Sequence, residues 1–271
     1  MLKNILLNLM RIAFFCKDDF NLGVAYVIGF LKSQGHDIKL FLSYRETALR
    51  SYNPELICIS CVTATVDWGI KIAKRIRTFS RVRIVFGGVH PTLCPETITN
   101  EGFEVCNGDG ISFFGGRFDP DNHWPDREIF FKELPPVHRR YQIFMTGFGC
   151  PFKCSYCNSQ NLHQKLIRRS VKGCIDELRY LKETGLKYVL FVDDVFVLNP
   201  TWLMQFLEEY SNNVNLPFTC FGHTKTITRE IAYNLRKSNC QAIWLGVQSG
   251  SENVRNNILN RYETNSEIFN A

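Results

Sequence analysis

The sequence predicts an α/β protein with two domains, each built on a parallel β-sheet. Short apolar segments of strand length alternate with amphipathic segments of helix length on both sides of a stretch rich in glycine and proline. Strands that alternate with helices favour parallel sheets with right-handed connections. The 271 residues, 45% of them hydrophobic, are enough for one large domain or two ordinary ones with buried cores.

The first part of the chain shows this alternation clearly. The helix predicted over residues 21–34 has apolar side chains at Leu22, Ala25, Ile28 and Leu31, a spacing that forms one stripe. Strands are predicted at residues 11–15, 37–42, 56–60, 83–86 and 103–106. Further helices are predicted at residues 66–79 and 95–100.

The middle of the chain changes character and then the alternation returns. Residues 111–140, which are punctuated by glycines and prolines, are predicted to be a linker between domains at residues 1–110 and 141–271. In the second domain, strands are predicted at residues 141–146, 188–192, 218–221 and 242–247. Helices are predicted at residues 170–184, 200–210, 228–237 and 252–260, which gives about four strand–helix units.

Composition excludes several classes of protein. The net charge of +6 is spread along the chain, which indicates solvated faces rather than a nucleic-acid groove. The sequence has no apolar run of 18 residues and no signal-peptide cleavage pattern, so neither a membrane span nor secretion is expected. Eleven cysteines, an odd number at irregular spacing, favour a reducing cytoplasm and a metal site over a disulfide framework.

The strongest chemical motif is a cysteine cluster after the strand at residues 141–146. Cys150, Cys154 and Cys157 have the spacing C-x3-C-x2-C. Thiolates are the usual ligands of iron–sulfur clusters, and three of them leave one iron of a [4Fe–4S] cluster open to an external ligand. Structural zinc, with His163 or Cys174 as a fourth ligand, and buried unreactive cysteines are the alternatives. The helical stripe around Cys174 predicts a core position for it.

Polar residues follow two of the later predicted strands. Asp193 and Asp194 come after the strand at residues 188–192, where the carboxyl end of a β/α strand is placed to bind ligands. Gln248 and Ser249 follow the strand at residues 242–247. Helix capping and a turn with a capping serine are the alternative interpretations of these two segments.

With its cysteine spacing, this half of the chain resembles the radical S-adenosylmethionine (SAM) superfamily, which implies a partial TIM barrel. The resemblance implies that Cys150, Cys154 and Cys157 hold the [4Fe–4S] cluster. It implies that the reduced cluster cleaves SAM to methionine and a 5′-deoxyadenosyl radical, which abstracts hydrogen from a substrate. The SAM contacts implied are Tyr156 at the adenine, Asp193 and Asp194 at the amino group, and His223, Gln248 and Ser249 at the remaining polar groups.

The barrel is expected to be incomplete. A radical SAM barrel has six strands, whereas about four strand–helix units are predicted here. The chain is therefore expected to be truncated at its C-terminal side, as a fragment, the product of a split gene or an internally shortened paralogue. The last predicted strand would then be an exposed edge.

The first domain resembles the cobalamin-binding domain that precedes many radical SAM domains, which implies a Rossmann-like (flavodoxin-like) sheet. The matching residues lie at the predicted carboxyl ends of strands: Asn21, Gly23, Ser60, Thr63, Gly87, Gly88, His90 and Gly108. A D-x-H-x-x-G loop for the lower cobalt ligand is absent. His36 is expected at the surface on the opposite side, and the role of His90 is left open. A flavodoxin-like domain that binds nothing is the alternative.

Together the resemblances imply a radical SAM enzyme that performs cobalamin-dependent methyl transfer or related radical chemistry. A small-molecule substrate and an electron donor such as flavodoxin or ferredoxin are implied as partners, in the cytoplasm and without nucleic acid. One alternative is a methylthiotransferase, which needs three further cluster cysteines; the candidates are Cys16, Cys58, Cys61 and Cys94. The chain could instead be a catalytically inactive remnant or a zinc-stabilised binding protein.

Overall fold

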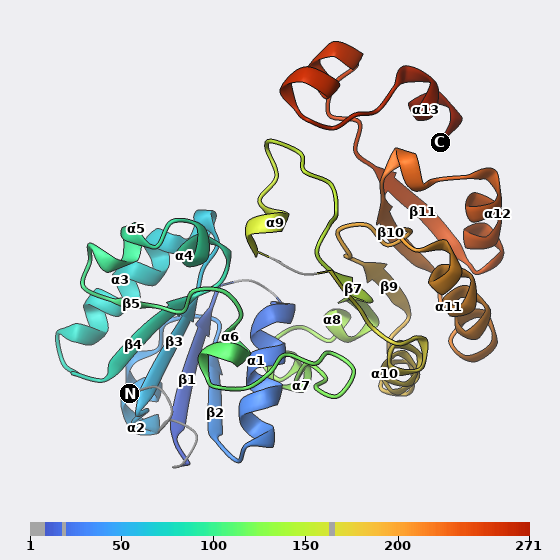
Figure 1. Cartoon of the computed structure of the whole chain (residues 1–271). Helices are drawn as coiled ribbons and strands as arrows, with labels where there is room; N and C mark the ends of the chain where they lie inside the picture. Colours follow the sequence, from blue (N-terminus) through green and yellow to red (C-terminus); the bar gives the residue numbers. More distant parts are fainter. Residues whose placement is uncertain (1–8, 18–19, 163–165) are drawn as a thin grey trace. The chain divides into compact units, whose positions relative to one another are not determined.

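The computed structural model describes residues 9–17, 20–162 and 166–271. The chain divides into two compact units, with the boundary between Pro135 and Pro136 (Figure 1). Each unit has its own parallel sheet, so the predicted α/β fold class is confirmed.

The first unit contains a parallel sheet in the order β2-β1-β3-β4-β5. Its strands are β1 (Arg11–Cys16), β2 (Asp37–Phe41), β3 (Leu56–Ser60), β4 (Arg83–Gly87) and β5 (Glu104–Val105). Cys16 pairs in register with Ser60, and Ser60 pairs with Gly87. The central strands therefore end at one common edge, which is where open α/β sheets bind ligands.

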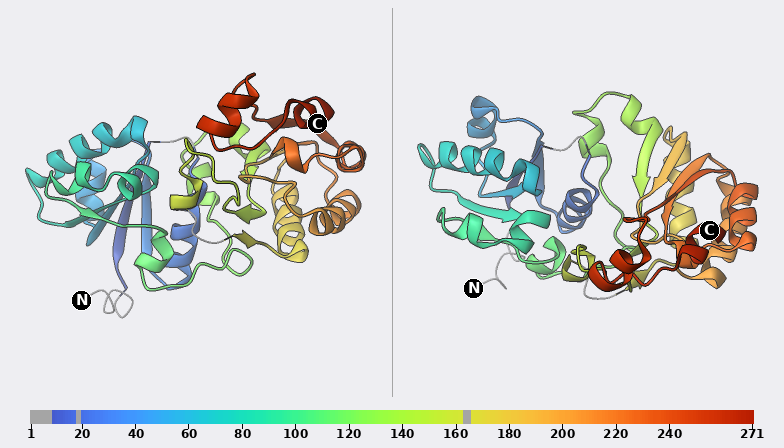
Figure 2. Two further views of the ribbon diagram at one scale, coloured as in Figure 1. Left: turned by 45° about the horizontal axis from the view of Figure 1, so that its top comes forward. Right: turned by 90° about the horizontal axis from the view of Figure 1, so that it is seen from above.

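Helices cover both faces of this sheet. Figures 1 and 2 show α1 (Leu22–Ser33) on one side and α3 (Val66–Arg77) on the other. Phe15 of β1 and Ile57 of β3 pack with Ile72 and Ile76 of α3 in one buried cluster. The intervening strand residues Ile12 and Phe14 are also buried, because a strand covered on both faces is apolar throughout.

Several short helices complete the first unit. They are η2 (Thr63–Thr65), α2 (Glu46–Tyr52), α4 (Val89–Leu93) and α5 (Glu96–Thr99). Helices α2 and α4 were not predicted from the sequence. Both are shorter than the window over which helical periodicity can be recognised, and α4 contains Pro91 shortly after a glycine pair.

The segment predicted as a linker carries structure of its own. It includes α6 (Gly110–Phe113), α7 (Glu128–Phe131) and α8 (Val137–Arg140), and residues up to Pro135 fall within the first unit. Asp126 binds α1 twice, through its backbone N–H to Ala25 and its carboxylate to Lys32. Ile129 and Phe130 are buried. This stretch therefore packs along α1.

The second unit contains a parallel sheet in the order β11-β10-β9-β6. Its strands are β6 (Tyr141–Phe144), β9 (Tyr188–Phe191), β10 (Phe218–Gly222) and β11 (Cys240–Leu245). The helices that follow them are α10 (Val171–Glu183), α11 (Pro200–Asn213) and α12 (Arg229–Lys237). Ser170, Asn199 and Thr228 cap these helices through side-chain oxygens, which explains where each helix begins.

Helices α10 and α11 pack against one face of this sheet. Cys174 of α10 is fully buried with Leu178, Phe191 and Phe206, so its predicted core position is confirmed. Strand β11 lies at the edge of the sheet, and its residues Gln241, Ala242 and Trp244 are exposed. The predicted exposed edge is therefore present in the described part of the second unit.

Smaller elements lie around the sheet of the second unit. A short antiparallel pair, β7 (Gly147–Phe148) and β8 (Ile167–Arg168), was not predicted, and neither were α9 (Ser159–Leu162), η3 (Thr224–Thr226) and α13 (Asn265–Asn270). Residues Val254–Ile258 form a π-helical turn, η4, where a longer helix over residues 252–260 was predicted. Wider turns of this kind are frequent at functional sites.

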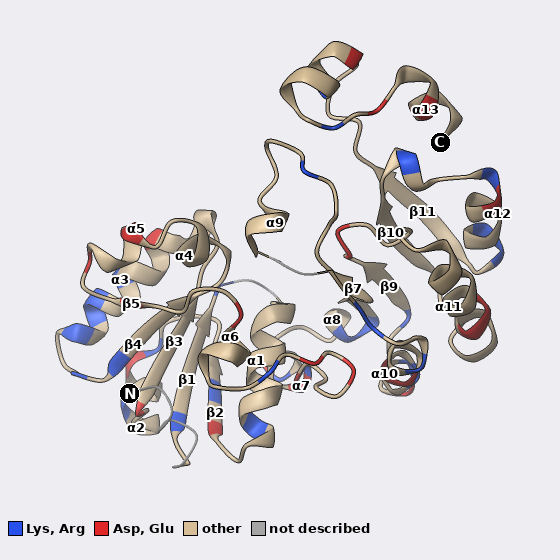
Figure 3. Cartoon of the chain, viewed as in Figure 1, with Lys and Arg blue, Asp and Glu red and all other residues tan. Residues whose placement is uncertain are grey.

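Charged residues are scattered over both units. In Figure 3 basic and acidic residues occur together on helices such as α10 and α12. Lys172 and Asp176 of α10 form an exposed ion pair of this kind. Within the described ranges, no helix combines the length and the apolar character needed to span a membrane.

Candidate functional site

The carboxyl ends of the strands in the second unit bring the predicted site residues together. Phe144 pairs with Phe191, and Phe191 pairs with Cys220, so the strands end at the same side of the sheet. The segments that follow β6, β9, β10 and β11 carry, in turn, the cysteine loop, the aspartate pair, His223 and the Gln248–Ser249 turn. Residues far apart in sequence thus meet at one edge.

The cysteine loop runs from Gly149 to Cys157 between β7 and α9. Cys150 and Cys154 are partly buried, Cys157 is exposed, and the three form no disulfide within the described ranges. Burial raises the pKa of the Cys150 thiol above its usual value, and the nearby Asp194 carboxylate and the thiols of Cys157 and Cys154 add to this shift. The Cys154 and Cys157 thiols are therefore close enough to affect the Cys150 thiol electrostatically.

The two aspartates after β9 have different environments. Asp193 is 2% exposed and accepts hydrogen bonds from the backbone N–H and the hydroxyl of Thr146, at 3.1 and 2.6 Å. Its carboxylate also pairs with Arg168 at 3.0 Å. Asp194 is exposed and accepts a hydrogen bond from the backbone N–H of Gly149 at 3.0 Å. Asp193 therefore stabilises the segment directly after β6, whereas Asp194 contacts the cysteine loop.

His223, the first residue after β10, is buried against the cysteine loop. Its ring stacks on Phe152 with the centroids 3.8 Å apart and the planes 15° apart. Its Nδ1 accepts a hydrogen bond from the Lys225 backbone and lies 3.3 Å from Glu263. Among the described residues its buried Nε2 has no hydrogen-bond partner. Burial is the main cause that lowers the pKa of His223 to about 4, so the ring is neutral at pH 7.

The segment after β11 carries Gln248 and Ser249 in a tight turn. Gln248 is exposed and adopts a left-handed backbone conformation with φ of 69°. The Ser249 backbone N–H binds the carbonyl of Val247 at 2.9 Å, and its hydroxyl accepts from the Ser251 N–H at 3.2 Å. The Ser249 carbonyl accepts from the Arg255 guanidinium at 2.6 Å, so this turn is bonded to the segment that follows it.

A buried charged group beside the loop was not predicted from the sequence. The Arg261 guanidinium donates to the Tyr156 hydroxyl at 2.9 Å and lies 4.0 Å from the Cys154 sulfur. It also donates to the Gly246 carbonyl at the end of β11 and pairs with Glu263. Arg261 is 7% exposed and Glu263 is fully buried. No local pattern in the sequence marks this group, because the contacts of Arg261 with the loop lie about a hundred positions away in the chain.

The C-terminal segment lies directly against the cysteine loop. Ser155 donates its backbone N–H to the Leu259 carbonyl at 3.0 Å and its hydroxyl to the Ile258 carbonyl at 2.8 Å. The Asn260 side chain donates to the Lys153 carbonyl at 2.7 Å. These bonds join the π-helical turn to the loop between Cys150 and Cys157, and Figure 1 shows both segments beyond the same end of the sheet.

The donor set fits an iron–sulfur cluster better than a single metal ion. Among the described residues, no group of three or more His, Cys, Asp and Glu side chains is placed to share one ion. In a [4Fe–4S] cluster each thiolate binds a different iron, so the sulfurs need not converge on one point. Cys174, one of the residues considered as a fourth zinc ligand, is buried in the core. His163, the other, lies outside the described residues.

The first unit gathers its own candidate residues at the carboxyl edge of its sheet. Ser60 and Gly87 are register partners, and Gly88 and Gly108 beyond the strand ends are exposed. Gly88 has φ of 96°, and a Cβ there would lie 2.8 Å from the Cys61 carbonyl oxygen. Only glycine fits this position without strain. A bulky planar ligand can approach the backbone closely at such an edge.

His90 lies at this edge but is already engaged. Its Nδ1 is 3.1 Å from the Thr63 hydroxyl and its Nε2 is 2.9 Å from the Thr97 hydroxyl, and the ring is buried. Asn21 caps α1 by accepting from the Val24 N–H, and Gly23 beside it is exposed.

The expectation that His36 lies at the surface is wrong. The His36 side chain is only 5% exposed, and its Nδ1 accepts a hydrogen bond from the backbone N–H of Met10.

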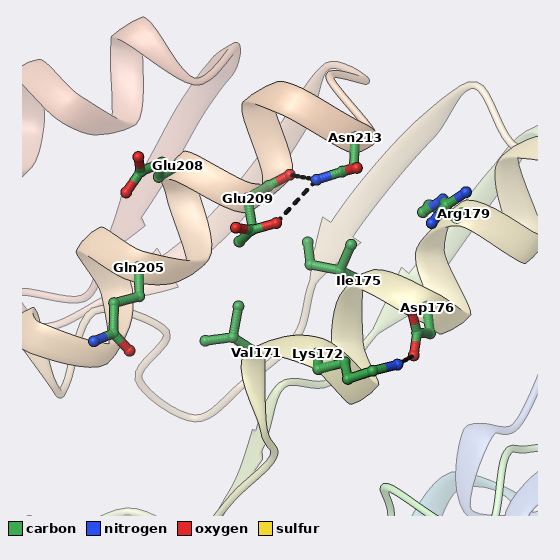
Figure 4. Close-up of a pocket in the computed structure, with 9 residues that line it drawn as sticks. All are labelled: Val171, Lys172, Ile175, Asp176, Arg179, Gln205, Glu208, Glu209 and Asn213. Atoms are coloured by element: carbon green, nitrogen blue, oxygen red, sulfur yellow. Dashed lines mark hydrogen bonds and ion pairs between the residues drawn. The ribbon is translucent and has the colours of Figure 1, made fainter.

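A separate depression lies between α10 and α11, away from the cysteine loop (Figure 4). It has a volume of about 510 Å³ and is lined by Val171 and Ile175 with charged residues such as Asp176, Arg179 and Glu209. Its charged side chains lie on α10 and α11. This depression has none of the predicted site residues in its lining.

The fold and the cysteine loop together define a protein with one open α/β domain followed by a second parallel-sheet domain that carries a three-cysteine loop. Comparison with protein families makes the assignment specific: residues 17–114 match the B12 binding domain and residues 144–271 match the radical SAM superfamily. The chain belongs to the class of radical SAM proteins that carry a B12-binding domain. The cofactors of these two domains are a [4Fe–4S] cluster, SAM and cobalamin, as the sequence predicted.

Two curated proteins are similar to this chain. An uncharacterized methyltransferase of Pyrococcus horikoshii, PH0819, is 24% identical over 86% of this chain and 61% of its own length. The anaerobic magnesium-protoporphyrin IX monomethyl ester cyclase of Cereibacter sphaeroides is 22% identical over 90% of this chain and 49% of its own length. The chain thus spans between about half and three fifths of the curated relatives it matches.

Solved structures of the radical SAM methyltransferase TsrM from Kitasatospora setae share the fold. The complex with tryptophan and a SAM analog has a TM-score of 0.73 and 15% identity, over 90% of this chain and 60% of that one. The complex with cobalamin and a [4Fe–4S] cluster has a TM-score of 0.73 and 14% identity, over 92% and 62%. At this identity the likeness is one of fold.

Proposed function

We propose that the chain supplies the cofactor-binding domains of a cobalamin-dependent radical SAM methyltransferase. The observation that carries the proposal is the position of the cysteine loop, which lies at the carboxyl ends of parallel strands beside Asp194 and His223. The B12-binding domain ahead of it supplies the second half of the argument. A methyltransferase among its relatives points to the same class of reaction.

In this proposal Cys150, Cys154 and Cys157 hold a [4Fe–4S] cluster, which supplies the electron for reductive cleavage of SAM. Asp194 accepts hydrogen bonds from the SAM amino group, because its carboxylate is exposed beside Gly149. Asp193 keeps Asp194 in place, since its own carboxylate is buried and bonded to Thr146 and Arg168. We therefore propose Asp194 rather than Asp193 as the direct SAM contact.

The remaining predicted SAM contacts are supported to different extents. His223 offers a neutral ring whose buried Nε2 has no partner among the described residues, which suits a hydrogen bond to a bound ligand. Tyr156 is 47% exposed and Gln248 is exposed, so both side chains are accessible to a nucleoside. Ser249 lies beside Gln248 in the turn after β11 and completes this polar rim.

The carboxyl edge of the first sheet is the proposed cobalamin site. Gly87, Gly88 and Gly108 leave room for the macrocycle, and Ser60 offers a hydroxyl at the same edge. His90 contributes by holding Thr63 and Thr97 together, because both of its ring nitrogens are already bonded. Asn21 and Gly23 form the start of α1 at the end of β1.

The proposed function also implies a class of substrate, a reductant and a cellular compartment. A small-molecule substrate suits a radical SAM domain, and the cluster needs a reductant such as flavodoxin or ferredoxin. Thiolate ligands must stay reduced, which suits the cytoplasm. A methylthiotransferase is less well supported, because Cys16, Cys58 and Cys61, which were its candidate ligands with Cys94, are buried. If the chain is instead an inactive remnant, it neither cleaves SAM nor transfers a methyl group in an activity assay.

The test is an anaerobic assay of the chain reconstituted with iron, sulfide and cobalamin. SAM with a labelled methyl group, a chemical reductant and a panel of small aromatic and tetrapyrrole substrates are added, and 5′-deoxyadenosine and labelled products are measured. SAM cleavage that requires Cys150, Cys154 and Cys157 supports the proposal. A loaded chain that binds SAM but neither cleaves it nor transfers its methyl group would support the inactive remnant instead.

A further inference from the structure

Arg261 connects the cysteine loop to the end of β11. Its Nη1 contacts the loop: it donates a hydrogen bond to the Tyr156 hydroxyl at 2.9 Å and lies 4.0 Å from the Cys154 sulfur. The same group donates to the Gly246 carbonyl at the end of β11. The loop and the strand end are therefore held by one side chain that comes from the segment after both.

The position of the guanidinium is fixed by a buried carboxylate. Glu263 is fully buried and pairs with Arg261 through the Nε side. The other carboxylate oxygen accepts from the Thr224 hydroxyl and lies 3.3 Å from His223. The segment itself is tied to the loop by the bonds from Ser155 to Leu259 and from Asn260 to Lys153. Arg261 therefore has little freedom to move away from Cys154.

An arginine suits this place for physical reasons. Its planar fork donates in several fixed directions at once, whereas a lysine ammonium has a single compact charge. An N–H donor and a positive charge beside a cysteinate sulfur stabilise the reduced, more negative state of an iron–sulfur cluster. The carboxylate of Glu263 lies on the far side of the guanidinium from Cys154, as its bond to Nε rather than Nη1 shows.

We propose that Arg261 is a positioning residue for the cluster: it fixes Tyr156 and Cys154 against the end of β11 and raises the reduction potential of the cluster. The proposal rests on the proposed function, because it concerns the cluster held by the cysteine loop. It gives the segment that carries Arg261 a role at the cluster.

The test compares reconstituted clusters in the wild-type chain and in Arg261→Gln, Arg261→Lys and Arg169→Gln. Arg169 is a matched control, since it is 1% exposed and pairs with Glu177 at 2.7 Å. Midpoint potentials are measured by redox titration followed by electron paramagnetic resonance (EPR), and cluster loss is followed after addition of an iron chelator. Neither measurement depends on SAM turnover.

Arg261→Gln is expected to shift the midpoint potential to a more negative value and to speed cluster loss by about tenfold or more. Arg261→Lys keeps the charge but not the fork, so its potential stays nearer to wild type while its cluster is lost quickly. Arg169→Gln leaves both quantities as in wild type. If Arg261→Gln matches wild type in both, or if Arg169→Gln shifts both equally, the proposal is wrong.

Misfolding of a variant and failure of the proposed function are distinguished as follows. If Arg261→Gln does not fold by circular dichroism, Arg261→Lys and Tyr156→Phe decide, since Tyr156→Phe removes only the hydroxyl to which Arg261 donates. Faster cluster loss in both supports the proposal, and wild-type rates in both overturn it. If the wild-type chain itself holds no cluster, the proposed function fails and this inference fails with it.

Discussion

The backbone N–H of Gly149 donates to the Asp194 carboxylate at 3.0 Å and so joins the residue before the first loop cysteine to the end of β9. Asp193, its neighbour in sequence, points the other way and is enclosed by Thr146 and Arg168. Asp193 precedes the turn that begins at Asp194, so the two neighbouring side chains have different surroundings. We therefore propose that Asp193 contributes to stability and that Asp194 contacts SAM.

Substitutions at these two adjacent residues are therefore expected to affect different quantities, stability at Asp193 and SAM binding at Asp194. Asp193→Asn leaves the Arg168 guanidinium without its charge partner and is expected to lower the free energy of unfolding by about 3 kcal/mol. Asp194→Asn is expected to leave unfolding within about 0.5 kcal/mol of wild type but to weaken SAM binding more than about tenfold. Chemical denaturation and anaerobic calorimetry with SAM measure the two quantities. Loss of SAM binding in Asp193→Asn with unchanged stability would reverse the assignment.

Gly88 and Gly102 provide a matched test of the proposed cobalamin edge. Both have positive φ, 96° and 77°, but a Cβ at Gly88 meets the Cys61 carbonyl at 2.8 Å whereas one at Gly102 meets nothing within 4 Å. Gly102→Ala is expected to cost about 1 kcal/mol from the left-handed backbone alone. Gly88→Ala is expected to cost more and to reduce cobalamin retention after gel filtration. Equal retention in the two variants would argue against this edge as the site.

The engaged ring of His90 leads to a spectroscopic prediction. Because both of its nitrogens bond threonine hydroxyls, His90 is not expected to coordinate cobalt. The EPR spectrum of cob(II)alamin bound to the chain should lack nitrogen splitting from a histidine, in wild type and in His90→Gln alike. His90→Gln should instead lower the melting temperature of the first unit. Nitrogen splitting that disappears in His90→Gln would show that His90 is a ligand.

His223 predicts a pH dependence of stability. Its pKa is about 4 in the folded chain against an ordinary value of 6.5, chiefly because of burial, while Glu263 and Glu267 oppose and Arg261 and Lys225 reinforce the shift. Between these two pH values the unfolded chain binds more protons, so the free energy of unfolding falls as the pH falls from about 6.5 towards 4. His223→Gln should flatten this slope, as measured by denaturation at a series of pH values. An unchanged slope in the variant would show that His223 titrates normally.

Sequence patterns were sufficient for the larger elements and insufficient for the charged interior. The strands of both sheets and helices α1, α3, α10, α11 and α12 were predicted because apolar periodicity extends over each of them. The short antiparallel pair of Gly147 with Arg168 has no such periodicity, and the Arg168 side chain pairs with the distant, buried Asp193. Short elements and long-range ion pairs leave no local pattern.

The candidate site was predicted as a set of residues rather than as a geometry. The cysteine loop and the polar strand ends were found because they lie at fixed spacings after predicted strands. Arg261 and Glu263 were missed because charged residues are usually exposed, and burial depends on contacts with Tyr156 and Thr224 that only the fold brings close. The same reason explains why His36 was wrongly placed at the surface.

The iron and sulfide content of the chain after anaerobic reconstitution decides whether the cysteine loop holds a cluster. We expect about four irons and four sulfides per chain, with an EPR signal on reduction. Alanine at Cys150, Cys154 or Cys157 should abolish this content, whereas Cys174→Ala, a change in the buried core, should retain it. Stoichiometric zinc with no sulfide, or a cluster that survives loss of the loop cysteines, would contradict the assignment of the loop as the cluster site.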